Sequence, residues 1–397
     1  MSKKIKILRI MHRINIGGPT YHAAYLTKFL DKEIFETLLI SGNINDNEES
    51  GEYILNEMDV SVKYINNMYR KINLFRDYYA YKEIKKIIKL YNPDIVHTHA
   101  AKPGFIGRLA ANNLKVPIII HTFHGHVFHS YFNFFKTRLF IFLERFLAKK
   151  TTKIIAISNA QKNELSKIYK IAKPEKIQII NLGFNLERFS TNTEVKRDTF
   201  RNEFNLKDDE IAIGIIGRLT AIKNQILFLD VIKFLKNNSS KEIKAFIIGD
   251  GEDRSILESY AMKIGLEYTT ERNKEHLKEL CFTSWRKDID VINCGLDIIC
   301  LTSLNEGTPV SLIEAMAAGK PIVSTNVGGV EDIVEDSNNG FLVNNNVADF
   351  SDKVLKLVES KTLRDKMSSM SKKKATEKFS YLRLVDDIEN LYKTLIK

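Results

Sequence analysis

Two kinds of hydrophobic pattern alternate along this chain. Short apolar runs rich in isoleucine and valine predict strands, and longer segments with an apolar residue at every third or fourth position predict helices. One such helix is expected at 78–91, where an apolar stripe lies among lysines. In the first half of the chain, the expected strands are 5–10, 37–40, 95–98, 117–122, 154–157 and 177–180. This alternation is typical of parallel α/β domains.

A second domain of the same kind is expected after a polar stretch at 190–210, which predicts a linker and a connecting helix. The strand pattern then restarts, with expected strands at 211–216, 245–248, 298–301 and 321–324. We therefore expect an α/β fold of two facing, doubly wound Rossmann-like domains, 1–190 and 191–378, with an interdomain cleft at the carboxyl ends of the strands. The amphipathic tail, 379–397, predicts a helix that packs back on the first domain.

Length and composition are those of a folded protein with two domains, since the chain has 397 residues and an apolar content of 44%. No apolar run reaches the ~20 residues that span a bilayer. The first residues predict a strand rather than a signal peptide. Cys281, Cys294 and Cys300 lack the spacing of metal ligands. These features predict a reduced, cytoplasmic compartment.

The positive charge is concentrated in the first half of the chain. Residues 1–190 contain 30 Lys and Arg against 16 Asp and Glu, a net charge of +14, whereas residues 191–397 contain 30 against 33, a net charge of −3. A basic half suggests an acidic partner such as a membrane surface or a polyanion, but a generally lysine-rich composition would give the same imbalance. Nucleic-acid binding is not expected, because no recognition motif accompanies the charge.

The segment 297–325 is the most informative part of the sequence, because it predicts a strand, a loop, a helix and a second strand. Thr308 suits the N-cap of the helix, Pro309 its first position, and Gly319 its end. The loop before the helix therefore presents free backbone amides at a helix N-terminus, where anions bind.

Two glutamates accompany this anion site. Glu306 precedes the amides, and Glu314 lies one turn into the helix on the same face as Val310. Because phosphates repel carboxylates, the partners of these carboxylates would be hydroxyl groups of a ribose or a hexose. Alternatively, both glutamates are ordinary surface residues, which the apolar run around Glu314 disfavours.

Two further loops carry residues that suit a phosphate ligand. Arg218 follows the turn at Gly217, and Lys223 lies at the opening of the next helix. A guanidinium fork and a compact ammonium suit a diphosphate, although solvated surface cations are a common alternative. In the first domain, Gly17 and Gly18 follow the first strand and permit a ligand to approach the backbone closely.

A group of four histidines, His121, His124, His126 and His129, begins within the last residues of the strand expected at 117–122. No metal site is expected, because acidic and cysteine ligands are lacking nearby and the helical His-Glu-x-x-His spacing does not occur. We expect these side chains to line a crevice, with His124 at the reaction centre. Two other motifs are discounted. Gly249-Asp-Gly251 lacks the third glycine of a dinucleotide fingerprint, and Asp288-Ile-Asp290 predicts the start of a helix.

Taken together, these segments resemble a known family. Glu306 and Glu314, separated by seven residues within Glu-Gly-Thr-Pro-Val-Ser-Leu-Ile-Glu, resemble the signature of the retaining family-4 glycosyltransferases (glycosyl transferases group 1), which have the GT-B fold. The resemblance extends over essentially the whole chain. It includes Gly17-Gly18, the segment from Pro93 to His99, the His124 segment, Gly217-Arg218 with Lys223, Gly249-Asp-Gly251 and the segment that begins at Trp285.

The resemblance implies a role for each candidate residue. Arg218 and Lys223 would hold the diphosphate of a nucleotide-sugar donor, and Glu314 would bind its ribose. The transferred sugar would be held by Glu306 and His124, the latter contacting the sugar or its leaving phosphate. The remaining donor-binding residues implied are Gly17 and Gly18 beside the diphosphate, Gly307, Thr308, Pro309 and Val310 at the sugar, and Trp285 and Arg286 at the base. Neither a metal nor another cofactor is implied, because the cations and helix N-termini can stabilise the departing diphosphate.

The implied reaction is retaining transfer of a hexose or N-acetylhexosamine, from a UDP-sugar in preference to a GDP-sugar. The acceptor would be a glycan or lipid-linked sugar of surface polysaccharide or glycolipid synthesis, at the cytoplasmic face of the membrane. The alternatives are a sugar-nucleotide epimerase on the same scaffold and a non-catalytic binder of sugar nucleotides or polyanions. The Phe-rich, basic segment 131–150 could lie on a membrane. For its second half, we instead expect a core-facing stripe of Leu139, Phe142, Leu143 and Phe146.

Overall fold

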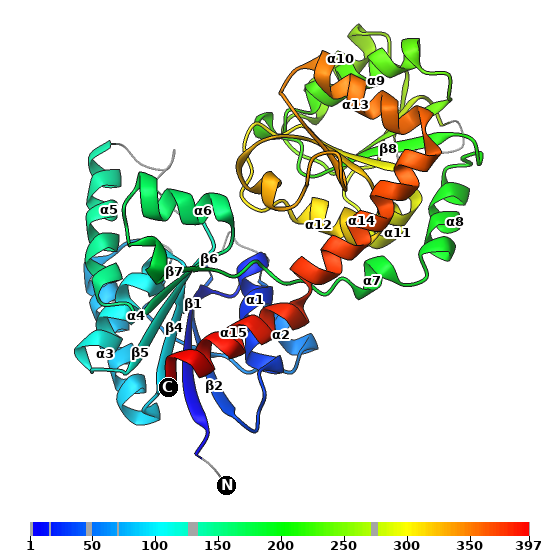
Figure 1. The fold of residues 1–397 in the computed structure, drawn as a ribbon. Helices are drawn as coiled ribbons and strands as arrows, with labels where there is room; N and C mark the ends of the chain where they lie inside the picture. The colour runs from blue at the N-terminus through cyan, green and yellow to red at the C-terminus, as the bar shows by residue number, and fades with distance from the viewer. Residues whose placement is uncertain are drawn as a thin grey trace. The chain divides into compact units, whose positions relative to one another are not determined.

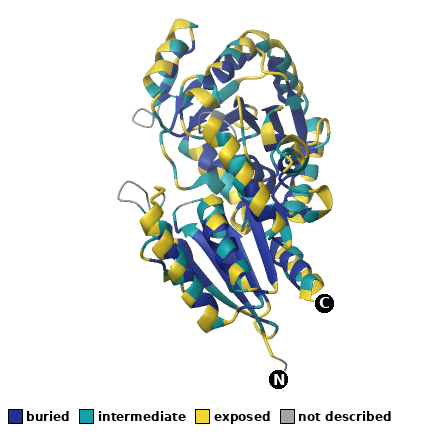
Figure 2. Cartoon of the chain, turned by 90° about the vertical axis from the view of Figure 1, so that its left-hand side faces the viewer, coloured by how far each residue is buried: buried dark blue, intermediate teal, exposed yellow. Residues whose placement is uncertain are grey.

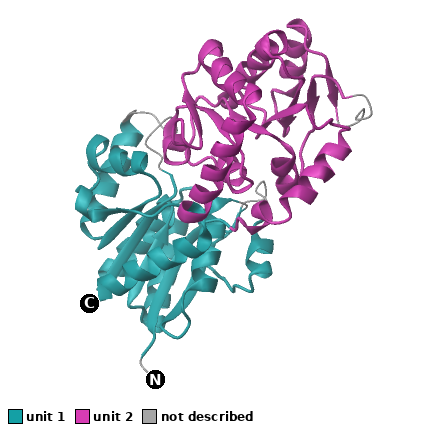
Figure 3. Cartoon of the chain, turned by 45° about the vertical axis from the view of Figure 1, so that its right-hand side comes forward, with its two compact units in different colours: residues 1–184, 379–397 teal, residues 185–378 magenta. Residues whose placement is uncertain are grey.

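The computed structural model describes residues 3–15, 17–44, 50–69, 71–125, 134–270 and 277–396. It divides into two compact units, which are residues 1–184 with 379–397 and residues 185–378 (Figures 1 and 3). The sequence placed this boundary at 190, six residues later than the structure does. At the boundary, the backbone of Phe184 is hydrogen-bonded to that of Phe379 and Tyr381, so the two segments that leave unit 1 lie side by side.

Unit 1 is built on a seven-stranded parallel sheet in the order β3-β2-β1-β4-β5-β6-β7. Its strands are β1 (Ile5–Arg13), β2 (Phe35–Gly42), β3 (Lys63–Tyr64), β4 (Ile95–His99), β5 (Ile118–Phe123), β6 (Lys153–Ala156) and β7 (Ile177–Ile179). Its helices are α1 (Gly18–Phe29), α2 (Glu52–Glu57), α3 (Leu74–Tyr91), α4 (Ala101–Asn113), α5 (Phe134–Lys149), α6 (Asn159–Asn163), the π-helix η1 (Glu164–Ile168), the 3₁₀ helix η2 (Pro174–Lys176) and α15 (Tyr381–Ile396). The central strands are buried because helices cover both faces, which is why their sequences are nearly continuous apolar runs (Figure 2).

The C-terminal helix α15 is part of unit 1. Its buried face consists of Leu384, Val385, Ile388, Leu391 and Tyr392. These side chains join the same hydrophobic core as residues of β1, β4 and β5. The spacing of apolar residues in the tail therefore matches the face that the helix buries.

Unit 2 repeats the architecture with a seven-stranded parallel sheet in the order β10-β11-β9-β8-β12-β13-β14. Its strands are β8 (Ile211–Ile216), β9 (Ile243–Ile248), β10 (Tyr268–Thr270), β11 (Leu280–Phe282), β12 (Ile298–Leu301), β13 (Ile322–Thr325) and β14 (Gly340–Val343). Its helices are α7 (Glu187–Ser190), α8 (Thr193–Glu203), the 3₁₀ helices η3 (Ala221–Lys223) and η5 (Gly328–Asp332), α9 (Gln225–Asn238), α10 (Arg254–Lys263), α11 (Ile289–Gly295), α12 (Val310–Ala317), α13 (Val347–Glu359) and α14 (Lys361–Phe379).

The α/β class and the Rossmann-like construction expected from the sequence are confirmed. In each sheet the strand order reverses beside the first strand, between β1 and β4 in unit 1 and between β8 and β12 in unit 2. Parallel α/β sheets bind ligands at such switch points, outside the carboxyl ends of the strands. A ligand site is therefore expected at the loops that follow β8 and β12 in unit 2, and at the loops that follow β1 and β4 in unit 1.

One expectation about α5 is wrong. Leu139, Phe142 and Phe146 are exposed, and the helix instead buries Glu144 and Leu147. The carboxylate of Glu144 pairs with Arg108 of α4 at 2.7 Å inside unit 1. Because α5 is apolar on more than one side, its periodicity could not show which side faces inward, and this buried ion pair decides it. None of the helices in the described ranges combines the length and apolar character that crossing a bilayer requires.

Candidate functional site

The loops that follow β8 and β12 meet at the switch point of unit 2 and bring Lys223 to Glu306. The ammonium of Lys223 donates to Glu306 Oε1 at 2.6 Å, and the hydroxyl of Ser303 donates to the same oxygen at 2.6 Å. The backbones are also joined, because the amide of Leu304 donates to the carbonyl of Ile222 at 2.8 Å. The structure thus places a cation and a carboxylate, predicted from separate motifs, in direct contact.

Two glycines that were not predicted as site residues, Gly328 and Gly329, pack closely against the backbone of the loop that carries Glu306. Gly328 has φ +54°, and a Cβ there would lie 1.8 Å from the carbonyl oxygen of Glu306. A Cβ on Gly329 would lie 1.9 Å from the carbonyl oxygen of Gly307. Side chains at either position would push the Glu306 loop away. The signal available in the sequence was a Gly-Gly pair shortly after a strand, as at Gly17-Gly18.

The N-terminus of α12 differs from the expectation in one respect. Its N-cap is Pro309, not Thr308, and the helix begins at Val310. The reason is that Pro309 has an extended backbone with ψ 102°, so helical geometry starts one residue later than the sequence suggested. Proline has no side-chain acceptor, and no side chain caps this end of the helix. Its first amides therefore remain available to an anion. Gly319 ends the helix region with φ +69°, in agreement with the prediction.

Glu314 lies on the partly exposed face of α12 together with Val310, whereas Leu312, Ile313, Ala315 and Met316 are buried. Burial raises the pKa of the Glu314 carboxyl to about 7, and Arg188 of α7 opposes this shift only in part. Within the described residues, no side-chain hydrogen bond is formed with this carboxyl. A partly buried carboxyl one turn into a helix whose N-terminus has no side-chain cap suits a ligand that brings both hydroxyl and phosphate groups.

The other predicted residues of unit 2 are less closely grouped. Arg218 has a side chain that is 66% exposed and lies 3.2 Å from Glu252, so the pair is weak in water. Trp285 is 65% exposed. Arg286 binds both carboxylate oxygens of Glu203 at 2.6 and 2.8 Å, and also binds Asp288. Its guanidinium therefore joins α8 to the start of α11, and its placement beside a nucleobase stays a prediction.

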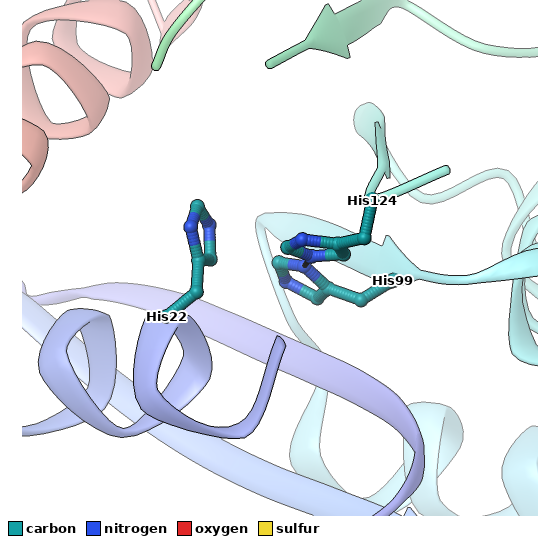
Figure 4. A group of neighbouring side chains, drawn as sticks. All are labelled: His22, His99 and His124. Carbon is teal, nitrogen blue, oxygen red and sulfur yellow. Dashed lines mark hydrogen bonds between the residues drawn. The ribbon is translucent and has the colours of Figure 1, made fainter. Parts of the chain in front are cut away.

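In unit 1, three histidines gather at the carboxyl edge of the sheet. His22 lies on α1, which Gly17 and Gly18 begin, His99 ends β4, and His124 directly follows β5 (Figure 4). The rings of His99 and His124 stack with centroids 5.3 Å apart, and His22 meets His124 edge-on at 4.9 Å. Burial lowers the pKa of His124 to about 4 and lowers those of His22 and His99, so the rings are neutral at pH 7.

The sequence selected His124 but not His22 or His99. His99 stood within the segment from Pro93 that carries the family resemblance, whereas His22 had no local signal. Each ring offers one nitrogen, and these three atoms all lie within 4.8 Å of one another, so the group is a candidate for a metal ion by ligand type. His126 and His129 lie outside the described residues, as does the segment 131–133.

Comparison with known proteins identifies the family of the chain. The chain matches the family model described as Glycosyl transferases group 1 over residues 196–374, and the model described as Glycosyltransferase Family 4 over residues 16–188. It is 30% identical to the UDP-Gal:alpha-D-GlcNAc-diphosphoundecaprenol alpha-1,3-galactosyltransferase of Escherichia coli, over 98% of this chain and 97% of that protein. The chain belongs to the family-4 (group 1) glycosyltransferases. The enzyme class expected from the sequence is thereby confirmed.

A further relative of this glycosyltransferase has a similar sequence, and solved structures support the fold. The capsular polysaccharide biosynthesis glycosyltransferase CapM of Staphylococcus aureus is 26% identical over 99% of both chains. Among solved structures, Anabaena HepE in complex with UDP superposes with a TM-score of 0.80 at 18% identity, covering 98% of this chain and 100% of that one. A glycosyltransferase from Rickettsia africae superposes with a TM-score of 0.79 at 22% identity, covering 100% and 99%.

Proposed function

We propose that this glycosyltransferase moves a hexose, with galactose as the first candidate, from a UDP-sugar to a sugar carried on a lipid diphosphate, with retention of anomeric configuration. The observation that carries the proposal is the contact of Lys223 with Glu306 beside the uncapped α12 and Glu314. The donor and acceptor are suggested by the name of the Escherichia coli relative and by the UDP in the HepE structure. A role in surface polysaccharide synthesis fits the name of CapM.

Each residue then has a distinct task. Lys223 and the α12 amides bind the diphosphate and stabilise the charge that develops on it as the sugar leaves. Arg218, which is exposed and weakly paired, adds a second cation. Glu314 accepts hydrogen bonds from the ribose hydroxyls, and Glu306 accepts hydrogen bonds from hydroxyls of the transferred sugar. His124 contacts this sugar or the leaving phosphate. These cations are the reason that we propose a reaction without a metal.

The transfer breaks the bond between the anomeric carbon and the β-phosphate oxygen. The electron pair of that bond stays on the departing UDP. The acceptor hydroxyl oxygen forms the new bond on the same face of the sugar, and its proton passes to the departing phosphate oxygen. This transfer does not require a covalent intermediate on any side chain. The chain contributes by positioning the substrates and by stabilising the developing charge electrostatically.

A transfer assay tests this function. The purified full chain is incubated with UDP-galactose, UDP-glucose, UDP-N-acetylglucosamine or GDP-mannose and an N-acetylglucosamine diphospholipid, and products are identified by mass spectrometry. We expect acceptor-dependent addition of one hexose from a UDP-sugar. Isomerised donor in the absence of acceptor would instead indicate an epimerase, and the absence of turnover with every donor would contradict the proposed reaction.

We further propose that unit 1 touches an anionic membrane through one face of α5. Phe135, Leu139, Phe142 and Phe146 follow one another at helical spacing and are exposed, Phe135 at 81% and Phe142 at 66%. The same helix carries Lys136, Arg138, Arg145 and Lys149, and its single acidic residue is buried against Arg108. An apolar stripe with basic flanks suits the surface of a bilayer that contains anionic lipids.

Substituting Leu139→Ser and Phe142→Ser together should weaken binding to phosphatidylglycerol vesicles by about tenfold or more. The reason is that the variant transfers less apolar surface from water into the bilayer. Co-sedimentation measures this, and added salt should weaken binding further. Ile256→Ser, an equally exposed apolar residue on α10 of unit 2, is the matched control and should bind as wild type does. If the double variant binds phosphatidylglycerol vesicles as tightly as wild type does, or if wild type binds neutral phosphatidylcholine vesicles equally well, the α5 face is not the contact with an anionic membrane.

A further inference from the structure

Arg9 is a fully buried arginine at the centre of the unit 1 sheet, and it contacts two histidines. Its Nη1 atom lies 3.3 Å from His97 Nδ1 and 3.4 Å from His99 Nε2. A guanidinium nitrogen can only donate hydrogen bonds. Nη1 carries two hydrogens, so it donates one to each ring, and both ring nitrogens must accept.

The Arg9 donor determines which ring nitrogen carries the hydrogen in His99 and then in His124. A neutral imidazole has one N–H and one acceptor nitrogen, and burial together with neighbouring charges keeps the pKa of His99 well below its ordinary value. Because His99 Nε2 accepts from Arg9, its Nδ1 carries the hydrogen. His99 Nδ1 lies 3.0 Å from His124 Nε2, to which it therefore donates (Figure 4). His124 must then carry its own hydrogen on Nδ1.

The Nδ1 atom of His124 is buried and has no hydrogen-bond partner among the described residues. An N–H in that position requires an acceptor. We propose that Arg9 and His99 are positioning residues that hold His124 in the Nδ1–H form, so that His124 donates a hydrogen bond to an oxygen of the transferred sugar or the leaving phosphate. This rests on the proposed contact of His124 with the donor. It also means that Nδ1 of His124 does not serve as a base.

The Nδ1–H form is the less populated neutral form of histidine in water, so the surroundings have to impose it. The remaining contacts of the network hold Arg9 and His97 in place for that purpose. The single lone pair of His97 Nδ1 is shared between Arg9 and the hydroxyl of Tyr392 on α15, which lies 2.6 Å away, and His97 Nε2 lies 2.7 Å from the Thr122 hydroxyl. Which ring nitrogen carries the proton is set by the bond that the other nitrogen makes.

The same contacts argue against a metal ion between His22, His99 and His124. If His99 Nδ1 bound a metal, its Nε2 would carry the hydrogen and would face the N–H of Arg9. The guanidinium charge would also repel a cation. His22 is 1% exposed, and neither of its ring nitrogens has a hydrogen-bond partner in the part of the chain that the structure describes. It therefore adds a second polar group for the ligand that His124 contacts.

Ring-¹⁵N NMR of histidine-labelled full chain, without any ligand, tests the proposed tautomers. We expect His124 to show a protonated Nδ1 and an unprotonated Nε2, and His99 to show the same pattern. The resonances are assigned by their loss in His124→Gln and His99→Asn. A wild-type His124 that carries its hydrogen on Nε2 would overturn the proposal, whatever reaction the enzyme performs.

Two substitutions of His99 distinguish positioning from packing. In His99→Asn the side-chain amide can still donate to His124, whereas His99→Leu keeps apolar bulk and removes the donor. We expect the Asn variant to keep the His124 tautomer and most of kcat. The Leu variant should lose the tautomer and lower kcat by about tenfold to a hundredfold, with a smaller change in KM.

Equal losses in both variants would indicate that His99 only fills space and would overturn the positioning role. A correct tautomer combined with full activity of His124→Gln would overturn the donation to the substrate while leaving the proposed glycosyl transfer intact. Complete absence of turnover in the wild type, by contrast, would contradict the proposed function and leave the tautomer measurement valid.

Discussion

Replacing Lys223 with Met is expected to lower kcat/KM for the UDP-sugar by about 100- to 1000-fold, the loss typical of removing one preorganised group that stabilises developing charge. Lys223 lies 2.6 Å from Glu306 at the edge where the α12 amides are exposed to a ligand. Steady-state kinetics with saturating acceptor measures the effect. The loss should appear in kcat as well as KM, because the charge on the diphosphate is greatest in the transition state.

Two comparisons show whether this loss is specific. Lys356→Met removes an exposed ion pair with Asp352 in the same unit, and it should leave kcat/KM unchanged. Among the described residues, removing Lys223 leaves the Ser303 hydroxyl as the one side-chain partner of the Glu306 carboxylate, so we expect a loss of about 1–2 kcal/mol in the free energy of unfolding. A folded Lys223→Met enzyme with the kinetics of wild type would contradict the assignment of Lys223 to the diphosphate.

Replacing Glu314 with Gln should stabilise the protein at pH 8 while weakening UDP binding. The Glu314 pKa is raised from 4.5 to about 7 by burial. Between these two values the folded state holds a proton that the unfolded state has released, so folding stability falls as pH rises through the window from 4.5 to 7. Glutamine carries no charge and avoids this loss. The variant should therefore be more stable than wild type by about 1–3 kcal/mol at pH 8.

The same substitution removes the strong acceptor for the ribose hydroxyls, so the Kd for UDP should rise by about tenfold or more. Thermal melts at pH 4.5 and pH 8, with UDP titration calorimetry at pH 8, measure both effects. The stability difference should be near zero at the lower pH. The exposed Glu377 of α14 provides the control substitution, Glu377→Gln, with no change in either quantity. A Glu314→Gln variant that is destabilised at pH 8, or that binds UDP as wild type does, would show that Glu314 has another role.

The parts of the site that the sequence predicted are those encoded by short-range patterns. The strand, loop and helix around Glu306 and Glu314 could be placed because β12, α12 and β13 follow one another within one βαβ unit. The contact of Lys223 with Glu306 was not predicted, and it arises because both residues follow strands that are neighbours at the switch point. Strand order itself was not readable from one sequence, and only the α/β alternation made it plausible.

What the sequence could not predict depends on tertiary contacts. The orientation of α5 is decided by the buried pair of Arg108 and Glu144, which are far apart in the chain. The N-terminus of α12 shifted by one residue because of the backbone angle of Pro309. Four strands were not predicted, namely β3, β10, β11 and β14. Each has only two to four residues, too few to show a clear strand pattern, and all except β11 lie at a sheet edge. Arg9 was hidden within an expected strand, where nothing local distinguishes a buried arginine from a surface one.

Binding of UDP to the purified full chain tests the central claim most directly, namely that the Lys223, Glu306 and Glu314 site takes a nucleotide-sugar donor. Thermal unfolding is measured with UDP, UDP-sugars, GDP and GDP-sugars at millimolar concentration. We predict that UDP and at least one UDP-sugar raise the Tm by several degrees, because ligand binding to the folded state adds to its stability. The shift should be smaller in Lys223→Met and in Glu314→Gln than in the wild type. If none of these nucleotides changes the Tm of the wild type, the assignment of this site to a nucleotide-sugar donor is wrong.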